Sequence, residues 1–182
     1  MKFVKYFLGF IGILVLVFVA IGFISPSISY ESEIEVNKPV KEAWAVMNDE
    51  SKISQWLKGL TKAELVSGEK GTVGAVTKFT FKQDGNESII TETIKSIEEN
   101  KHVSMTFVIK DVMNMDYRLD FTEKDGKTYI KSSTINNGEG FIMRSMVPLM
   151  KSAMQKQEDE NIANLKAVIE SNTTNYEVEK LS

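Results

Sequence analysis

The stretch from Gly140 to Glu170 constrains the fold of this chain more than any other, because it is a long amphipathic helix that follows every predicted strand. Its apolar residues recur three and four positions apart, which places them on one helical face. The N-terminal half of that face carries four methionines, Met143, Met146, Met150 and Met154. The charged residues Lys151, Lys156, Glu158 and Glu160 fall on the opposite face. The pattern predicts a helix that closes a sheet and forms one wall of an apolar cavity.

The two halves of this helix have different compositions. The second half, from Ile162 to Ile169, carries conventional aliphatic residues and is predicted to clamp the helix onto the sheet. The first half contains Pro148, which removes a backbone donor and crowds the preceding turn. One interpretation is a kink near residues 144–147 that lets the first turns act as a flap. The other is that Pro148 lies in the first turn of the main helical segment.

Residues 61–138 alternate between apolar and polar side chains, which is the period of a β-strand. The alternation is clearest from Met113 to Thr122, and an Asp125-Gly126 hairpin signal follows it. Strands joined by such short turns predict an antiparallel meander with one covered face. A further strand is predicted over residues 28–36, followed by two short helices. In this interpretation Asn37 caps the first of these helices. The predicted class is therefore α+β.

The N-terminal segment is almost purely apolar and carries no charged residue from Tyr6 to Ile24. Nineteen residues at about 1.5 Å each give a helix just under 30 Å long, which spans a bilayer core. We assign residues 1–27 to a transmembrane signal anchor, residues 28–171 to the folded domain and residues 172–182 to a loose C-terminal tail. The alternative for the first segment is a cleaved signal peptide, although its apolar run exceeds the usual 7–15 residues.

The charges around this segment predict its orientation. Lys2 and Lys5 precede it, whereas Glu31 and Glu33 follow it. The positive-inside rule then places the N-terminus in the cytoplasm and the domain outside it, in a single-pass topology. Cleavage of the segment would instead give a secreted or periplasmic protein.

Composition excludes several classes of function. The chain has no cysteine and one histidine, so disulfides, thiolate chemistry and cysteine-based metal sites are absent, and we predict no metal and no cofactor. The single histidine, His102, lies at a turn and is interpreted as solvated. Two of the 22 Lys and Arg residues precede the apolar segment, which leaves 20 against 25 Asp and Glu. An acidic domain of this kind is not expected to bind nucleic acid.

The order of these elements resembles the helix-grip fold of the START/Bet v 1-like (SRPBCC) superfamily, and within it bacterial polyketide cyclase/dehydrase-like proteins. The resemblance covers about residues 30–170 and is carried by the segments Val36–Val40 with Trp44, Ile53–Trp56, Gly71–Gly74 and Leu165-Lys166 with Glu170. It implies a curved antiparallel sheet of a strand, two short helices and six further strands, wrapped around the last helix. It also implies a hydrophobic cavity that takes lipids, polyketides or similar ligands. The family's catalytic residues vary, so none is carried over.

The leading hypothesis is therefore membrane-anchored binding of a lipid or another hydrophobic small molecule, without a catalytic residue. Two alternatives remain, a cyclase- or dehydratase-like enzyme acting on a polyketide-like substrate and a protein-interaction module without a ligand. An enzyme would require ionisable groups inside the cavity, and Glu92 and Arg118 are interpreted as facing away from it. The candidate ligand-binding residues are Trp56, Phe79, Phe81, Met105, Phe107, Met115, Tyr117, Leu119, Met146, Met150 and Met154.

Overall fold

The computed structural model describes residues 2–83 and 85–176. Its elements follow the chain as α1 (Lys2–Ile24), β1 (Ser27–Val36), α2 (Val40–Asn48), α3 (Glu50–Trp56), β2 (Leu60–Ser67), β3 (Val76–Gln83), β4 (Asn86–Glu98), β5 (His102–Ile109), β6 (Met113–Lys124), β7 (Lys127–Gly138) and α4 (Gly140–Glu170). The predicted strand, helix pair, six strands and final helix are all present.

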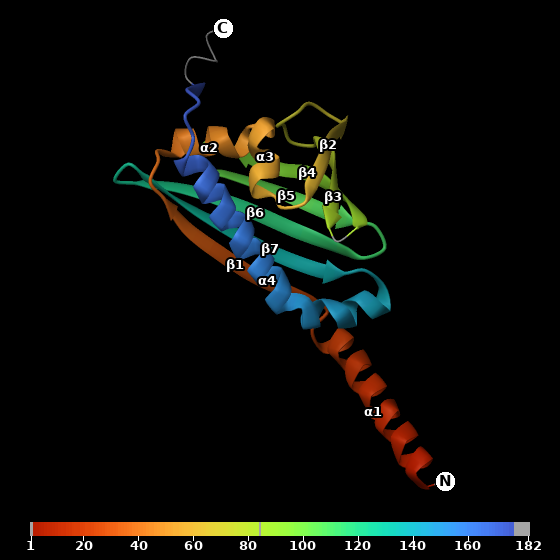
Figure 1. Cartoon of the computed structure of the whole chain (residues 1–182). Coiled ribbons are helices and arrows are strands. Elements are labelled where there is room, and N and C mark those ends of the chain that lie inside the picture. Colours follow the sequence, from red (N-terminus) through yellow and green to blue (C-terminus); the bar gives the residue numbers. More distant parts are fainter. Residues whose placement is uncertain (1, 84, 177–182) are drawn as a thin grey trace.

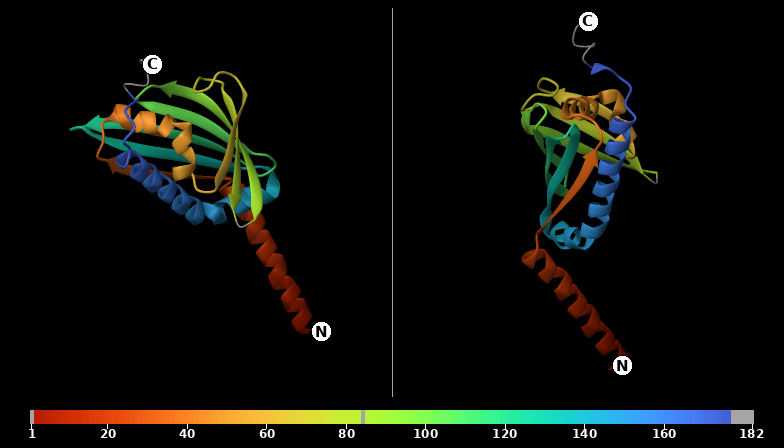
Figure 2. Two further views of the ribbon diagram at one scale, coloured as in Figure 1. Left: turned by 45° about the horizontal axis from the view of Figure 1, so that its top comes forward. Right: turned by 90° about the vertical axis from the view of Figure 1, so that its left-hand side faces the viewer.

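One antiparallel sheet of seven strands organises the domain, in the order β1-β7-β6-β5-β4-β3-β2. Six consecutive strands form a meander, and β1 joins it at the far edge beside β7. Asp125 and Gly126 both have positive φ (53° and 73°), which forms the tight hairpin between β6 and β7 that the sequence predicted. The sheet is curved, and α4 lies across its concave side (Figures 1 and 2). This is a helix-grip fold, as the resemblance implied.

The core on the concave face consists of two clusters of different size. Helix α4 packs on β1, β7, α3 and α2, and its first turns also contact α1. Its second half is fully buried at Ile162, Leu165 and Ile169, and these residues belong to the main core with Trp44, Leu119 and Phe121. The predicted clamp is confirmed. A smaller cluster joins Val147, in the first half of α4, to Ile28, Tyr30 and Met113 of the sheet.

Helix α4 is continuous across Pro148 and begins eight residues before it, so Pro148 is not in its first turn. The first turns are bent relative to the rest of the helix (Figure 1). The bend agrees with the loss of the backbone donor at Pro148.

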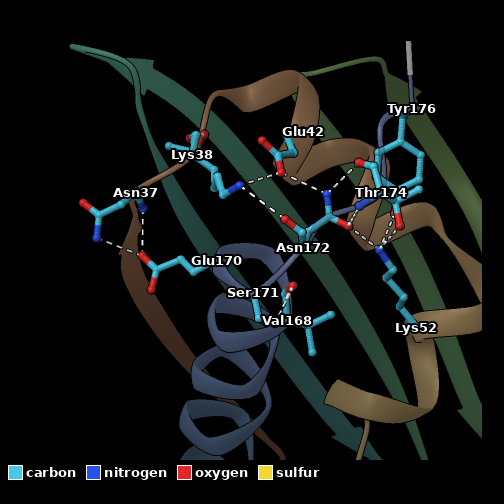
Figure 3. Close-up of polar contacts among 11 residues, drawn as sticks. Asn37, Lys38, Glu42, Lys52, Val168, Glu170, Ser171, Asn172, Thr174 and Tyr176 are labelled. Atoms are coloured by element: carbon cyan, nitrogen blue, oxygen red, sulfur yellow. Dashed lines mark hydrogen bonds and ion pairs between the residues drawn. The ribbon is translucent and has the colours of Figure 1, made fainter. Parts of the chain in front are cut away.

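Hydrogen bonds hold the end of α4 to the first helices, as Figure 3 shows. Asn37 does not cap α2: its backbone N–H and its side-chain amide donate to the Glu170 carboxylate at 2.8 and 2.9 Å. The free N–H of Val40 donates instead to the Glu123 carboxylate at 2.8 Å. The expected cap was wrong because a carboxylate from the last helix competes for Asn37.

The first residues of the expected loose tail make contacts with α2 and α3 (Figure 3). Asn172 is buried, accepts a hydrogen bond from Lys52 and donates one to Glu42 at 2.9 Å. The Lys52 ammonium also donates to the hydroxyls of Thr174 and Tyr176 at 3.1 and 2.8 Å. The domain therefore continues to Tyr176, and residues 177–182 of the expected tail lie outside the described residues.

Helix α1 projects away from the domain, and its side chains are almost all exposed (Figure 2). It is long and apolar enough to cross a membrane. A core helix would be buried, but a cleavable signal sequence would share these properties.

Candidate functional site

Two rows of inward-facing side chains cross the sheet beneath α4. Strand pairing sets Tyr30, Thr134, Tyr117, Met105 and Ile94 side by side on β1, β7, β6, β5 and β4. The next row, one pleat nearer to α1, consists of Ile28, Asn136, Met115, Phe107 and Glu92. Since successive side chains in a strand point to opposite faces, both rows lie on the concave face.

Seven of the predicted ligand-binding residues share this face. Of these, Phe79 and Leu119 are buried, and the other five are half-buried: Phe81, Met105, Phe107, Met115 and Tyr117. The Phe107 and Tyr117 rings meet edge to face with their centroids 5.9 Å apart. Inward apolar side chains on the central strands of a sheet are normally fully buried, because the second layer covers them. Here α4 lies over β1 and β7, and the inward face of β5 and β6 retains accessible apolar surface.

Trp56 ends α3 and is buried in the main core. Its indole N–H has no hydrogen-bond partner among the described residues. Buried indole N–H groups usually have one, so this donor is an unsatisfied polar group in the core.

The methionines of α4 do not form the expected buried stripe. Met143 and Met154 are half-buried and pack on the small cluster, whereas Met146 and Met150 are 38% and 37% exposed. The reason is that α4 packs on the sheet mainly through β1 and β7, so the helical face that carries Met146 and Met150 is left exposed.

Glu158 was assigned to the solvated face of α4, and this assignment was wrong. It is buried at 8% exposure and accepts a 2.8 Å hydrogen bond from the Tyr117 hydroxyl at the centre of the sheet. Burial raises the pKa of Glu158, and the hydrogen bond from Tyr117 opposes part of that rise. The same burial, together with the negative charge of Glu158, raises the pKa of Tyr117 well above its usual value.

Polar side chains from β7 extend this buried pair. Ser132, Thr134 and Asn136 are 0–2% exposed, and their hydroxyls and the Asn136 amide make no hydrogen bond of normal geometry among the described residues. Thr134 and Asn136 nevertheless lie near enough to Tyr30 to affect the pKa of its hydroxyl, which burial raises. We call the group Tyr30, Tyr117, Ser132, Thr134, Asn136 and Glu158 the inner polar cluster.

This cluster was not predicted from the sequence. Along Lys131–Asn137 both faces of β7 carry polar residues, so the alternation between apolar and polar positions that marks an inward face is missing. The one available signal was the polar composition of this part of β7, which is unusual for a strand inside a sheet.

Glu92 was also expected to face away from the cavity, and the strand register corrects this. It pairs with Phe107 on β5 and Thr77 on β3, on the concave face. Burial raises the pKa of Glu92 to about 7. Among the described residues its carboxylate has no ion-pair or hydrogen-bond partner, and the side chain is half-buried. It is thus an isolated carboxyl group that titrates near neutral pH beside an apolar surface.

Arg118 faces away from the cavity, as expected. Arg118 and Asp120 form an ion pair at 2.6 Å on the outer face of β6, and Asp116 accepts a hydrogen bond from Thr106 at 3.1 Å. His102 begins β5, with its Nδ1 3.9 Å from Glu98. Over the described ranges no group of three or more His, Asp or Glu residues is placed to hold a metal ion.

Two surface hollows lie outside the grip. One of about 510 Å³ is bounded by α2, α3, Lys70, Thr174 and Tyr176. The other, of about 280 Å³, lies between the end of α1 and the start of α4, beside Phe23, Phe141 and Arg144.

The sequence matches one protein family, and the structure is similar to many solved structures. The model of a family described as "Polyketide cyclase / dehydrase and lipid transport" matches residues 27–170. No curated protein matches the sequence at a significant level.

Among solved structures, the chain is similar to Ara h 8.0201, with a TM-score of 0.64, 19% identity and coverage of 80% of this chain and 99% of that one. A protein from Thermus thermophilus gives a TM-score of 0.66, 14% identity and coverage of 81% and 100%. The Zhui aromatase/cyclase from Streptomyces sp. R1128 gives a TM-score of 0.67 and 10% identity, with coverage of 79% of this chain and 94% of that one. At these identities the similarity establishes the fold alone.

Proposed function

Because the chain belongs to the polyketide cyclase/dehydrase and lipid transport family, we propose that it binds a lipid or another hydrophobic small molecule between the concave face of its sheet and α4. Helix α1 anchors the domain in a membrane, with the N-terminus in the cytoplasm and the domain outside it. One observation carries the proposal: the inward side chains Met105, Phe107, Met115 and Tyr117 lie on central strands and are only half-buried.

The ligand in this proposal has an apolar body and a polar group. The apolar body covers the accessible surface of β5 and β6, where each square ångström removed from water contributes about 25 cal/mol. The polar group reaches the inner polar cluster, where Asn136 offers an unpartnered donor and an unpartnered acceptor in a fully buried position. A hydroxyl or carbonyl group satisfies such an amide, which otherwise costs about 1–3 kcal/mol to leave unpaired.

The anchor has a thermodynamic role in this function. A domain tethered to a bilayer meets membrane-dissolved molecules at a high effective concentration without any additional contact. A hydrophobic ligand with low solubility in water then reaches the site by a short path.

The test is mass spectrometry of the full-length protein, extracted from membranes in mild detergent and kept under native conditions. The proposal predicts a bound hydrophobic molecule in substoichiometric to stoichiometric amount. Met115→Trp, which fills the concave face, is predicted to lose it, whereas Asn114→Trp retains it because Asn114 is exposed on the opposite face. A protein that remains empty after incubation with membrane lipids, or two variants that bind equally, would contradict the proposal.

A second function is favoured by the carboxyl groups on the concave face. Glu92 has a pKa of about 7, where a general acid or base is most effective, and it faces the same apolar surface. An enzyme of the cyclase or dehydratase type would use Glu92 to move a proton on a bound carbonyl compound. The reaction is followed in the mass spectrum as the loss of one water from the bound compound. Glu92→Gln is predicted to retain the bound compound but not to convert it. Conversion at an unchanged rate in Glu92→Gln would exclude this role.

A further inference from the structure

The first half of α4 exposes large apolar side chains on its outer surface. Within ten residues, Phe141, Ile142, Met146, Leu149 and Met150 are 49%, 65%, 38%, 61% and 37% exposed. The buried side chains of the same segment, Ser145 and Val147, lie on other faces of the helix. A concentration of exposed apolar residues on one element is typical of a surface that contacts another phase or molecule. We call Ile142, Met146, Leu149 and Met150 the apolar stripe.

The charges of this segment differ from those of the whole chain. From Gly140 to Gln157 there is no acidic residue, and Arg144, Lys151 and Lys156 are basic, although the chain carries a net charge of −3. All three basic side chains are exposed. A cationic amphipathic helix of this kind is suited to an anionic lipid surface.

Helix α1 ends directly against this segment (Figure 1). Gly22 is buried against Ser145: a Cβ at Gly22 would lie 2.3 Å from the Ser145 Oγ and 3.1 Å from its backbone nitrogen. The Phe23 and Phe141 rings are 6.1 Å apart. The last turn of the apolar span and the first turns of α4 therefore form one contiguous packed unit.

We propose that the apolar stripe lies in the interface of the bilayer that holds α1, with Arg144 and Lys151 contacting anionic headgroups. The inference rests on the proposed anchoring of α1 and adds a defined orientation of the domain. The headgroup layer extends only about 5–8 Å beyond the hydrocarbon core, so a helix packed on the last turn of a span lies at that depth. The bilayer is favoured over a second copy of the chain as the partner of the apolar stripe, because all charged residues of the segment are basic and two such segments would repel each other.

The absence of cysteine in the sequence permits a direct test. Single substitutions Ile142→Cys and Leu149→Cys, labelled with an environment-sensitive fluorophore, are placed in the full-length protein in vesicles of three parts phosphatidylcholine to one part phosphatidylglycerol. Val73→Cys is the control, since Val73 is 61% exposed and lies in the turn between β2 and β3, at the other end of the domain from α1 (Figure 1). Leu14→Cys reports whether α1 itself is embedded.

A nitroxide on the lipid acyl chain is predicted to quench the probes at positions 14, 142 and 149 several-fold more strongly than the probe at position 73. Combined Arg144→Gln and Lys151→Gln substitution is predicted to weaken quenching at positions 142 and 149 without changing it at position 14. Quenching at position 14 with positions 142 and 149 equal to position 73 would overturn the inference and leave the anchor intact. An unquenched position 14 would remove the anchor and the inference together. Probes at 142 and 149 shielded from both the lipid nitroxide and aqueous iodide would assign the stripe to a second copy or another protein, and would equally overturn the inference.

Discussion

The hydroxyl of Tyr117 donates a 2.8 Å hydrogen bond to the carboxylate of Glu158, and this bond joins the centre of the sheet to α4. Glu158 is buried and Tyr117 is half-buried. It is a polar contact between α4 and β6, whereas the helix packs on the sheet mainly through β1 and β7.

Removing the donor of this pair is predicted to destabilise the domain. Tyr117→Phe leaves the Glu158 carboxyl group buried without its hydrogen bond, which costs about 1–3 kcal/mol. Urea unfolding in mild detergent, followed by circular dichroism, measures the change. Tyr129→Phe is the matched control, since Tyr129 donates a 2.9 Å bond to Glu35 on the outer face and its loss is expected to cost under about 1 kcal/mol. Equal losses in the two variants would show that burial does not strengthen the Tyr117 bond.

The stability of the protein is predicted to fall as the pH rises from about 4.5 to 7. The pKa of Glu92 is about 7 in the folded protein and 4.5 when unperturbed, so within this range the folded state holds a proton that the unfolded state has released. Stability from the protonated group is complete below this range and is lost as the pH passes through the folded pKa, with a slope of up to about 1.4 kcal/mol per pH unit. Glu158, whose pKa is also raised by burial, acts in the same direction.

Unfolding measured at several pH values tests this assignment. Glu92→Gln is predicted to flatten the slope between pH 5 and 7, whereas Glu87→Gln, on the same strand but exposed, leaves it unchanged. A slope that persists in Glu92→Gln and Glu158→Gln together would place the titrating groups elsewhere.

The contact between α1 and α4 is predicted to depend on the absence of a side chain at Gly22. A methyl group there meets both the hydroxyl and the backbone of Ser145, and such overpacking typically costs about 1–3 kcal/mol. Gly22→Ala is expected to increase hydrogen exchange in residues 140–147. Gly12→Ala provides the comparison, because a Cβ at Gly12 has no neighbour within 4 Å. Unchanged exchange in Gly22→Ala would mean that α1 and α4 are not packed together in the membrane.

Asn172 is predicted to hold the C-terminal end of α4 to the first helices. Its side chain bonds with Lys52, Glu42 and the backbone of Thr174, so Asn172→Ala leaves several buried groups unpaired and is expected to cost about 1–3 kcal/mol. Thr173→Ala, at an exposed neighbouring position, is expected to change the free energy of unfolding by less than about 0.5 kcal/mol. Chemical unfolding of the full chain compares them, and a stable Asn172→Ala variant would make the network dispensable.

The fold was predictable because its patterns are local. Clean alternation from Met113 to Thr122, a hairpin turn at Asp125-Gly126 and a helical period from Ile162 to Ile169 each specify one element and its buried face. Their order then leaves few ways of covering the sheet.

The site was less predictable because its polar members are identified only through distant partners. Glu158 occupies a buried position in α4 only because Tyr117, on a strand 41 residues earlier, supplies a donor. The facing of Glu92 was missed because β4 carries a bulge between Ile94 and Ser96, and adjacent Ile89 and Ile90 leave the alternation ambiguous. The exposure of Met146 and Met150 depends on which strands α4 covers, and no local pattern specifies this.

The central claim is that the concave face of β5 and β6 holds a hydrophobic ligand, and photolabelling tests it most directly. The full-length protein in vesicles is irradiated with a fatty acid that carries a diazirine on its chain, and the labelled peptides are identified by mass spectrometry. We predict labels on Met105, Phe107 and Met115, in addition to labels along α1 from the surrounding lipid. Excess unlabelled lipid is predicted to prevent the labelling of the three concave-face residues, and Met115→Trp is predicted to abolish it. Labels confined to α1 and the outer surface, with the concave face unlabelled, would contradict the claim.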